Sequence, residues 1–169
     1  MRSLIIGRFQ PLHLGHVKMI EYAAAKSKFL TIGLGSCNLC DTYENPFTAE
    51  EREHMIKESV SIETPYEIKR IPDFGDPPRW AAWIADNINF DAVMTNSPCE
   101  KEIFTKAGKK VIDIPFFDRQ QYSASEVRDR ILADDNWVEL LPAGTVKVMT
   151  HIDGKYRIAS LTRRHKACK

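Results

Sequence analysis

The feature that most limits the fold is an apolar, strand-like stretch followed at once by a polar turn and a helix. Residues 4–7 are apolar and β-prone enough for a buried strand, and residues 17–25 repeat apolar side chains with helical periodicity. A helix that begins just after a strand has unpaired backbone N–H groups in its first turn, and the positive end of its dipole lies there. The sequence therefore predicts an anion-binding site at this turn.

Side chains in the turn reinforce this prediction. His13 and His16 are three residues apart, so they share one face if both lie in the first helical turn. Gly15 lets a ligand come close to the backbone, and Arg8 adds a permanent positive charge at the strand end. The alternative interpretation is that the two histidines only cap the helix or lie on the surface.

Strand-like segments recur between helical segments along the first two thirds of the chain. The four further expected strands cover residues 29–35, 66–71, 91–95 and 110–114. Five strands that alternate with helices predict an α/β fold with a doubly wound parallel sheet. Residues 66–71 alternate apolar and polar side chains, which suits a sheet edge. From residue 137 the pattern is helical, with a break at Pro142 and turns expected at Gly144 and Gly154.

Helix boundaries are marked by capping residues. Thr48 with Glu51, and Ser123 with Glu126, have the spacing of a capping box. Gly108 stands where a helix would end with a left-handed residue.

Length and charge restrict the class of protein. The 169 residues and the hydrophobic fraction of 43% fit a single domain, residues 1–169. A net charge of +1 argues against a general nucleic-acid binder, and the basic residues 163–169 fit a solvated terminal helix. No stretch has the length of a transmembrane helix, and Met1 leads directly into a strand, so we expect a cytoplasmic protein without membrane contact.

The cysteines give little indication of chemistry. Cys37 and Cys40 form a lone CxxC pair, whereas structural zinc needs four ligands. The residues after Cys40 resemble a loop, and a redox pair would open a helix. We expect small thiols beside a loop.

A second candidate phosphate site begins at a later helix. The sequence contains neither a P-loop nor a dinucleotide fingerprint. In residues 122–128, YSASEVR, hydroxyl groups open a helix, and Arg128 can reach back one turn to a phosphate. The alternative is an ordinary capped helix with a surface arginine.

Three segments together resemble one enzyme family. Residues 7–16, GRFQPLHLGH, are similar to the GRFQPxHxGH signature of nicotinamide mononucleotide adenylyltransferases, within the HxGH nucleotidyltransferase superfamily. Residues 122–128 resemble its ISSTxxR motif, with Tyr122, Ala124 and Ser125 as mild departures. Residues 45–52 resemble the NPFTAGER stretch of the small archaeal form. Glu44 stands where some members have a basic residue, which removes a cationic contact from that position.

The resemblance implies a fold and a set of site residues. The implied fold is a Rossmann-like sheet with strand order 3-2-1-4-5 and C-terminal helices. The resemblance also implies a homo-oligomer, with a hexamer as the expected form. The implied catalytic residues are His13, His16 and Arg128, and the ATP and phosphate contacts are Arg8, Phe9, Gly15, Ser123 and Ser125. Contacts to nicotinamide mononucleotide are implied for Trp80, which could instead be a core aromatic beside Trp83, and for Asn96.

The implied reaction transfers AMP from ATP to nicotinamide mononucleotide and yields NAD and pyrophosphate by direct in-line attack. A phosphate monoester has a second pKa near ~6, so the attacking group is mostly dianionic at neutral pH and needs no general base. Mg²⁺ would bind through the ATP phosphates, without a metal site made by protein side chains.

Two alternatives stay open. The acceptor could be nicotinate mononucleotide or another phosphomonoester, although residues 8–11 argue against FMN and phosphopantetheine. In a different class, the protein could be a non-catalytic sensor that binds NAD or ATP.

Overall fold

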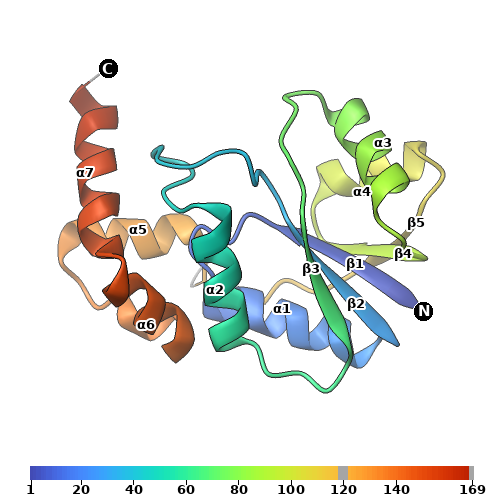
Figure 1. Cartoon of the computed structure of the whole chain (residues 1–169), viewed down its shortest axis with the longest axis horizontal. Coiled ribbons are helices and arrows are strands. Elements are labelled where there is room, and N and C mark those ends of the chain that lie inside the picture. The colour runs from blue at the N-terminus through green and yellow to red at the C-terminus, as the bar shows by residue number, and fades with distance from the viewer. Residues whose placement is uncertain (118–121, 168–169) are drawn as a thin grey trace. The chain divides into compact units, whose positions relative to one another are not determined.

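The apolar segments form a parallel sheet, as the sequence predicts. The computed structural model describes residues 1–117 and 122–167 (Figure 1). The strands are β1 (Arg2–Gly7), β2 (Phe29–Leu34), β3 (Tyr66–Arg70), β4 (Ala92–Thr95) and β5 (Lys110–Asp113). The five strands lie in the order β3-β2-β1-β4-β5, and every neighbouring pair is parallel. The predicted strand order is confirmed, and β3 is the edge strand that its alternating pattern indicates.

The chain divides into two compact units. The first comprises Met1–Gly7, Lys18–Cys37 and Ser61–Phe116, and it contains the whole sheet. The second comprises Arg8–Val17, Asn38–Val60 and Phe117–Lys169, of which residues 118–121 and 168–169 are outside the described part. The single domain expected from the sequence stays a prediction.

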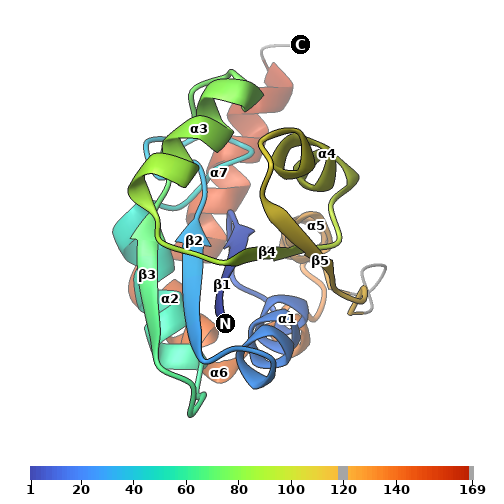
Figure 2. The same ribbon diagram turned by 90° about the vertical axis from the view of Figure 1, so that its right-hand side faces the viewer.

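Helices cover both faces of the sheet in the first unit. Successive strand residues point to opposite faces of a sheet, so the side chains of Ser3 and Leu4 in β1 lie on different faces. Leu4 packs in a buried cluster with Ile84 of α3 (Pro77–Asn87) and Phe104 of α4 (Pro98–Lys106). On the other face, Ser3 Oγ lies 2.7 Å from Ser27 Oγ, just beyond the end of α1 (Leu14–Ala25). Figures 1 and 2 show α1 opposite α3 and α4.

The second unit is helical. Its elements are α2 (Ala49–Ser59), α5 (Ala124–Ala133), the 3-10 turn η1 (Val138–Leu140), α6 (Ala143–His151) and α7 (Gly154–Ala167). The expected C-terminal helices are therefore confirmed. Among the described residues, no helix is both long and apolar enough to cross a membrane.

The turn expected at Gly144 is wrong, because Gly144 lies inside a helix, whereas Gly154 directly follows a turn at residues 152–153, close to where a turn is expected. Gly144 is the second residue of α6, and a Cβ atom there would lie 2.2 Å from the carbonyl oxygen of Glu58 in α2. Gly154 opens α7, where a Cβ atom would lie 3.2 Å from the Met149 carbonyl oxygen. Close backbone approach, rather than a turn, explains the residue type at position 144.

The helix caps follow the sequence with one exception. The Thr48 and Glu51 capping box of α2 is complete, and Gly108 has a φ of +70° just after α4. Ser123 caps α5 by accepting from the Glu126 backbone N–H at 3.0 Å. The Glu126 carboxylate instead accepts from Arg130 Nε at 2.9 Å, so the predicted box at α5 is only half formed.

Candidate active site

The loop after β1 turns sharply before it enters α1. Phe9 has a φ of 50°, in the left-handed region, which costs a non-glycine residue roughly 1–2 kcal/mol. Its ring is buried and lies edge-on to the His16 ring, with 4.8 Å between the centroids. Phe9 thus contacts a site residue through packing, and its predicted contact with ATP stays a prediction.

Gln10 holds this loop against the segment that precedes α2. Its side-chain Nε2 donates to the Phe47 carbonyl oxygen at 3.0 Å, and its Oε1 accepts from the Phe47 backbone N–H at 2.9 Å. Both groups are buried, so either hydrogen bond would be costly to lose. The GRFQP and NPFTA segments are therefore fastened together inside the second unit.

His13 and His16 form a stacked pair at the start of α1. Their ring centroids are 3.6 Å apart, and the rings are tilted by 21°. The His13 backbone N–H donates to His16 Nδ1, and the His16 backbone N–H donates to His13 Nδ1, both at 3.3 Å. Since both Nδ1 atoms accept, the proton of each neutral imidazole is on Nε2.

Burial keeps both imidazoles neutral at neutral pH. It lowers the pKa of His13 to about 4. The pKa of His16 is also well below its usual value, first because of burial and then because of the nearby His13 charge. The pair therefore offers two uncharged Nε2–H donors rather than a general acid or a cation.

Gly15 leaves room that any other residue would fill. A Cβ atom at this position would lie 2.9 Å from the Tyr122 Cβ atom and 3.2 Å from His13 Nδ1. Glycine at this point lets the start of α1 approach the segment before α5. The sequence predicted a glycine for ligand approach, and packing against Tyr122 is a second reason for it.

Arg128 links the second motif to the first. Its side chain is 8% exposed, and Nη1 donates to the Gln10 carbonyl oxygen at 3.1 Å. Its buried Nε atom has no hydrogen-bond partner among the described residues. Burial lowers its pKa, Tyr43 opposes this, and the Arg8 guanidinium lowers it further. An arginine with an unpaired buried donor is suited to an anion, and the surface-arginine alternative is wrong.

Arg52 supports the same loop from α2. It is fully buried, and its Nη1 donates to the Arg8 carbonyl oxygen at 2.8 Å while Nε donates to the Thr48 carbonyl oxygen at 3.1 Å. The Arg8 side chain itself is exposed. Arg52 therefore fixes the backbone from which Arg8 extends.

The hydroxyl groups predicted to bind phosphate lie at the start of α5. Ser123 Oγ is the N-cap acceptor, so its own O–H is still available to donate. Ser125 is exposed in the first turn of α5.

Trp80 and Asn96 belong to the first unit. The Trp80 ring is half-buried against the core, 5.6 Å from the Phe104 ring centroid. Asn96 follows β4, and its Nδ2 donates to the Pro115 carbonyl oxygen at 3.3 Å. The second unit thus brings together Arg8, Phe9, His13, Gly15, His16, Ser123, Ser125 and Arg128, whereas the contacts of Trp80 and Asn96 with the acceptor stay predictions.

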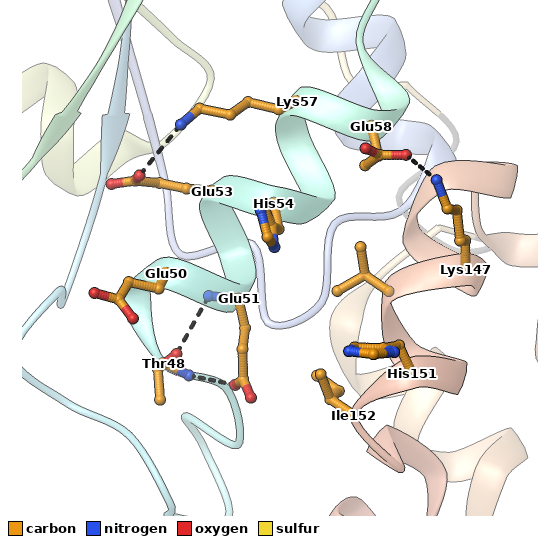
Figure 3. Close-up of a pocket in the computed structure, with 11 residues that line it drawn as sticks. Thr48, Glu50, Glu51, Glu53, His54, Lys57, Glu58, Lys147, His151 and Ile152 are labelled. Carbon is orange, nitrogen blue, oxygen red and sulfur yellow. Dashed lines mark hydrogen bonds and ion pairs between the residues drawn. The ribbon is translucent and has the colours of Figure 1, made fainter.

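A pocket of about 750 Å³ lies between α2 and α6 (Figure 3). His54 and His151 line it from the two helices. Around them, Glu58 pairs with Lys147 at 2.7 Å, and Glu53 pairs with Lys57 at 3.7 Å. None of the predicted site residues lines this pocket.

The described ranges contain no metal site made by protein side chains alone, and the Cys40 thiol has a raised pKa. Within residues 1–117 and 122–167, no three His, Cys, Asp or Glu side chains form a group that could hold a metal ion. Cys40 Sγ hydrogen-bonds to Asp41 Oδ2, which is the main reason that the pKa of this thiol is raised. A raised pKa disfavours the thiolate that redox or zinc chemistry requires.

Sequence patterns alone do not indicate that Gln10 and Arg52 support the site. Arg52 gives a signal of burial only, because it shares the inward face of α2 with Met55 and Ile56. A charged residue on an apolar helix face is buried for a reason. Gln10 shows no such signal, since its partner Phe47 is 37 residues away in the sequence.

Comparisons with known proteins give the relatives of this chain. Residues 4–130 match the Cytidylyltransferase-like family. A nicotinamide-nucleotide adenylyltransferase from Methanolobus tindarius is 37% identical over 169 residues, which cover 98% of this chain and 96% of the relative. One from Thermococcus sibiricus is 35% identical over 95% of this chain and 89% of the relative. One from Methanococcus aeolicus is 36% identical over 95% of both.

Solved structures share the fold at lower identity. A bifunctional NMN adenylyltransferase/ADP ribose pyrophosphatase from Francisella tularensis, complexed with AMP and a manganese ion, superposes with a TM-score of 0.76 at 22% identity. This chain covers 53% of that protein and is itself covered to 96%. A second structure of the bifunctional protein superposes with a TM-score of 0.79 at 20% identity. The motifs, the fold and the near full-length similarity place this chain in the nicotinamide-nucleotide adenylyltransferase family, within the cytidylyltransferase-like proteins.

Proposed function

We propose that the protein transfers the adenylyl group of ATP to nicotinamide mononucleotide and forms NAD and pyrophosphate. The observation that carries this proposal is the stacked pair of neutral histidines in the same unit as a buried arginine with an unpaired donor. Names of relatives that are 31–37% identical support the same substrates.

The histidines suit a reaction that needs no proton transfer. At neutral pH the acceptor phosphate is mostly dianionic, since its second pKa is near ~6. The lowered pKa values of His13 and His16 keep both rings neutral. We assign their Nε2–H groups to the phosphate oxygens that gain charge during direct in-line attack on the α-phosphorus.

Positive charge is supplied by Arg8 and Arg128. Two anions must approach one another, so catalysis depends on charge compensation and alignment. We assign Arg8 and Arg128 to the β- and γ-phosphates, and Ser123 and Ser125 to phosphate hydrogen bonds. Gly15 carries no side chain that would press on the His13 ring.

ATP would enter as its Mg²⁺ complex. The phosphate oxygens would hold the ion, which keeps most of its own water and offsets phosphate charge. Arg8, Arg128 and the Nε2–H groups of the two histidines are cations and donors, not metal ligands, which fits a metal carried by the nucleotide.

We assign Trp80 and Asn96 to the acceptor side. Trp80 would stack on the nicotinamide ring with the part of its side chain that the core leaves uncovered. The homo-oligomer, for which the family resemblance implies a hexamer, stays a prediction. The cytoplasmic location also stays a prediction.

Product analysis tests the proposal. The protein is incubated with ATP, Mg²⁺ and one acceptor at a time: nicotinamide mononucleotide, nicotinate mononucleotide, FMN or phosphopantetheine. We expect NAD and pyrophosphate in equal amounts with nicotinamide mononucleotide. Turnover of a different acceptor alone would reassign the substrate, and tight binding of NAD or ATP without pyrophosphate release would indicate a sensor.

A further inference from the structure

The guanidinium of Arg128 has a hydrogen bond on one side, and a further contact is needed to fix its orientation. Within the described residues Nη1 donates to the Gln10 carbonyl oxygen, and the buried Nε has no hydrogen-bond partner. One hydrogen bond leaves a long side chain free to rotate about its terminal bonds. A second contact is required to keep the planar group in one orientation.

The Tyr43 ring supplies such a contact. The Arg128 Cζ atom lies 5.5 Å from the Tyr43 ring centroid, within the range of a cation–π interaction. Tyr43 lies in a tight turn in which the Thr42 N–H donates to the Asn45 carbonyl oxygen at 3.2 Å and the Asn45 N–H donates to Thr42 Oγ1 at 3.0 Å. The turn fixes the backbone of Tyr43 but not its ring.

His165 holds that ring from the C-terminal helix. The His165 and Tyr43 centroids are 4.6 Å apart, and the rings are tilted by only 10°, so they stack. Helix α7 is fastened near its start by Arg157, which pairs with Glu51 at 2.6 Å, and by Lys155, which pairs with Asp134 at 2.6 Å. A chain of contacts therefore runs from α7 through His165 and Tyr43 to Arg128.

We propose that Tyr43 is a positioning residue for Arg128, and that His165 of α7 holds Tyr43 in the orientation that Arg128 requires. The basic end of α7 then acts through an aromatic ring rather than through its charge. The proposal rests on the proposed function, because it assumes that Arg128 binds the polyphosphate.

Pyrophosphate titration by calorimetry tests the proposal without turnover, and steady-state kinetics gives the KM values. Tyr43→Leu and His165→Ala should each raise the Kd for pyrophosphate and the KM for ATP by about three- to tenfold, as expected for loss of a partly buried cation–π contact. The KM for nicotinamide mononucleotide should stay within twofold. Tyr43→Phe and His165→Phe keep the rings and should restore wild-type affinity.

Matched controls separate stacking from charge. Arg163→Ala and Lys166→Ala each remove one exposed positive charge from the same helix end and should leave the Kd for pyrophosphate unchanged. An increase in Kd with these controls that equals the increase with His165→Ala would mean that α7 acts by charge, and would overturn the proposal.

A double-mutant cycle decides whether Tyr43 acts through Arg128. In an Arg128→Met background, which removes the cation, Tyr43→Leu should have no further effect on pyrophosphate affinity, whereas an additive effect would refute the proposal. Wild-type affinity in both Tyr43→Leu and His165→Ala would refute it as well. If the wild-type protein forms no NAD in the product analysis, the proposed function fails instead, and the pyrophosphate titration still tests the positioning of Arg128 separately. His165 lies near the end of α7, so His165→Ala keeps the test usable if Tyr43→Leu does not fold.

Discussion

The two nitrogen atoms of each active-site histidine have separate tasks. In His13 and His16 the Nδ1 atoms accept backbone N–H groups at the start of α1, both at 3.3 Å. The Nε2–H groups are left for a ligand. Capping and phosphate binding, which the sequence offered as alternatives, are thus compatible in one side chain.

This division predicts the behaviour of two substitutions at His16. His16→Asn keeps an acceptor near the Nδ1 position and loses the Nε2–H donor, so kcat should fall by about two to three orders of magnitude with little change in Tm. His16→Ala should lose kcat similarly and also about 1 kcal/mol of stability, because the acceptor is gone. Steady-state kinetics and urea denaturation measure both.

His54→Asn is the matched control for these variants. His54 is an exposed histidine of α2 on the pocket of Figure 3, away from the predicted site. It should keep wild-type kcat. Near-normal kcat in His16→Asn would remove the Nε2–H donor from the mechanism.

The buried His13 ring predicts a pH-dependent loss of stability. Its pKa is about 4 in the folded protein and close to 6.5 when unfolded. Between these values the unfolded state binds a proton that the folded state does not, so stability falls as the pH falls from 6.5 to 4. The loss from this group is about 3 kcal/mol, and it levels off below pH 4.

Comparison with His13→Asn isolates this contribution from that of the carboxylates. Urea denaturation at several pH values between 7 and 4 should give a wild-type curve that falls by about 3 kcal/mol more than the curve of the variant. Parallel curves would show that the folded protein accepts the proton on His13 as readily as the unfolded chain.

At the scale of secondary-structure elements, local sequence patterns were sufficient where neighbours in sequence interact. The capping box of Thr48 and Glu51 and the left-handed Gly108 were predicted correctly because their partners lie within four residues. Glu126 is an exception among local contacts, because Arg130, four residues later, competes for its carboxylate. The turn predicted at Gly144 is wrong because glycine is needed there for close contact with another helix, α2, which local sequence patterns do not reveal.

The contact between α2 and α6 predicts a large effect at Gly144. A Cβ atom there would lie 2.2 Å from the Glu58 carbonyl oxygen, so the two helices would have to separate. Gly144→Ala should lower the free energy of unfolding by about 3 kcal/mol, as overpacking between backbones does. Urea denaturation monitored by circular dichroism measures this.

Gly108→Ala provides the comparison. A Cβ atom at Gly108 meets no heavy atom within 4 Å, so only its φ of +70° opposes the substitution, which should cost about 1 kcal/mol. A smaller loss for Gly144→Ala than for Gly108→Ala would contradict the close packing of α2 and α6.

At the scale of the whole molecule, the sequence predicts the sheet and the candidate site residues, but not the long-range contacts that hold those residues in place. Alternating apolar segments predicted the strands, and the family resemblance predicted their order. The hydrogen bonds between Gln10 and Phe47 join residues 37 positions apart. The stacked rings of Tyr43 and His165 are 122 positions apart in the sequence. Periodicity carries no information at such distances, so these contacts could only come from the structure.

Isotope exchange tests the central claim, direct adenylyl transfer from ATP to nicotinamide mononucleotide. The protein is incubated with ATP, Mg²⁺ and labelled pyrophosphate, with and without the acceptor. Without acceptor, no label should enter ATP, since direct attack needs the acceptor phosphate; with acceptor, NAD should form and the label should appear in ATP. Label in ATP without acceptor would reveal an adenylylated enzyme, and an absence of NAD with acceptor would contradict the proposed function itself.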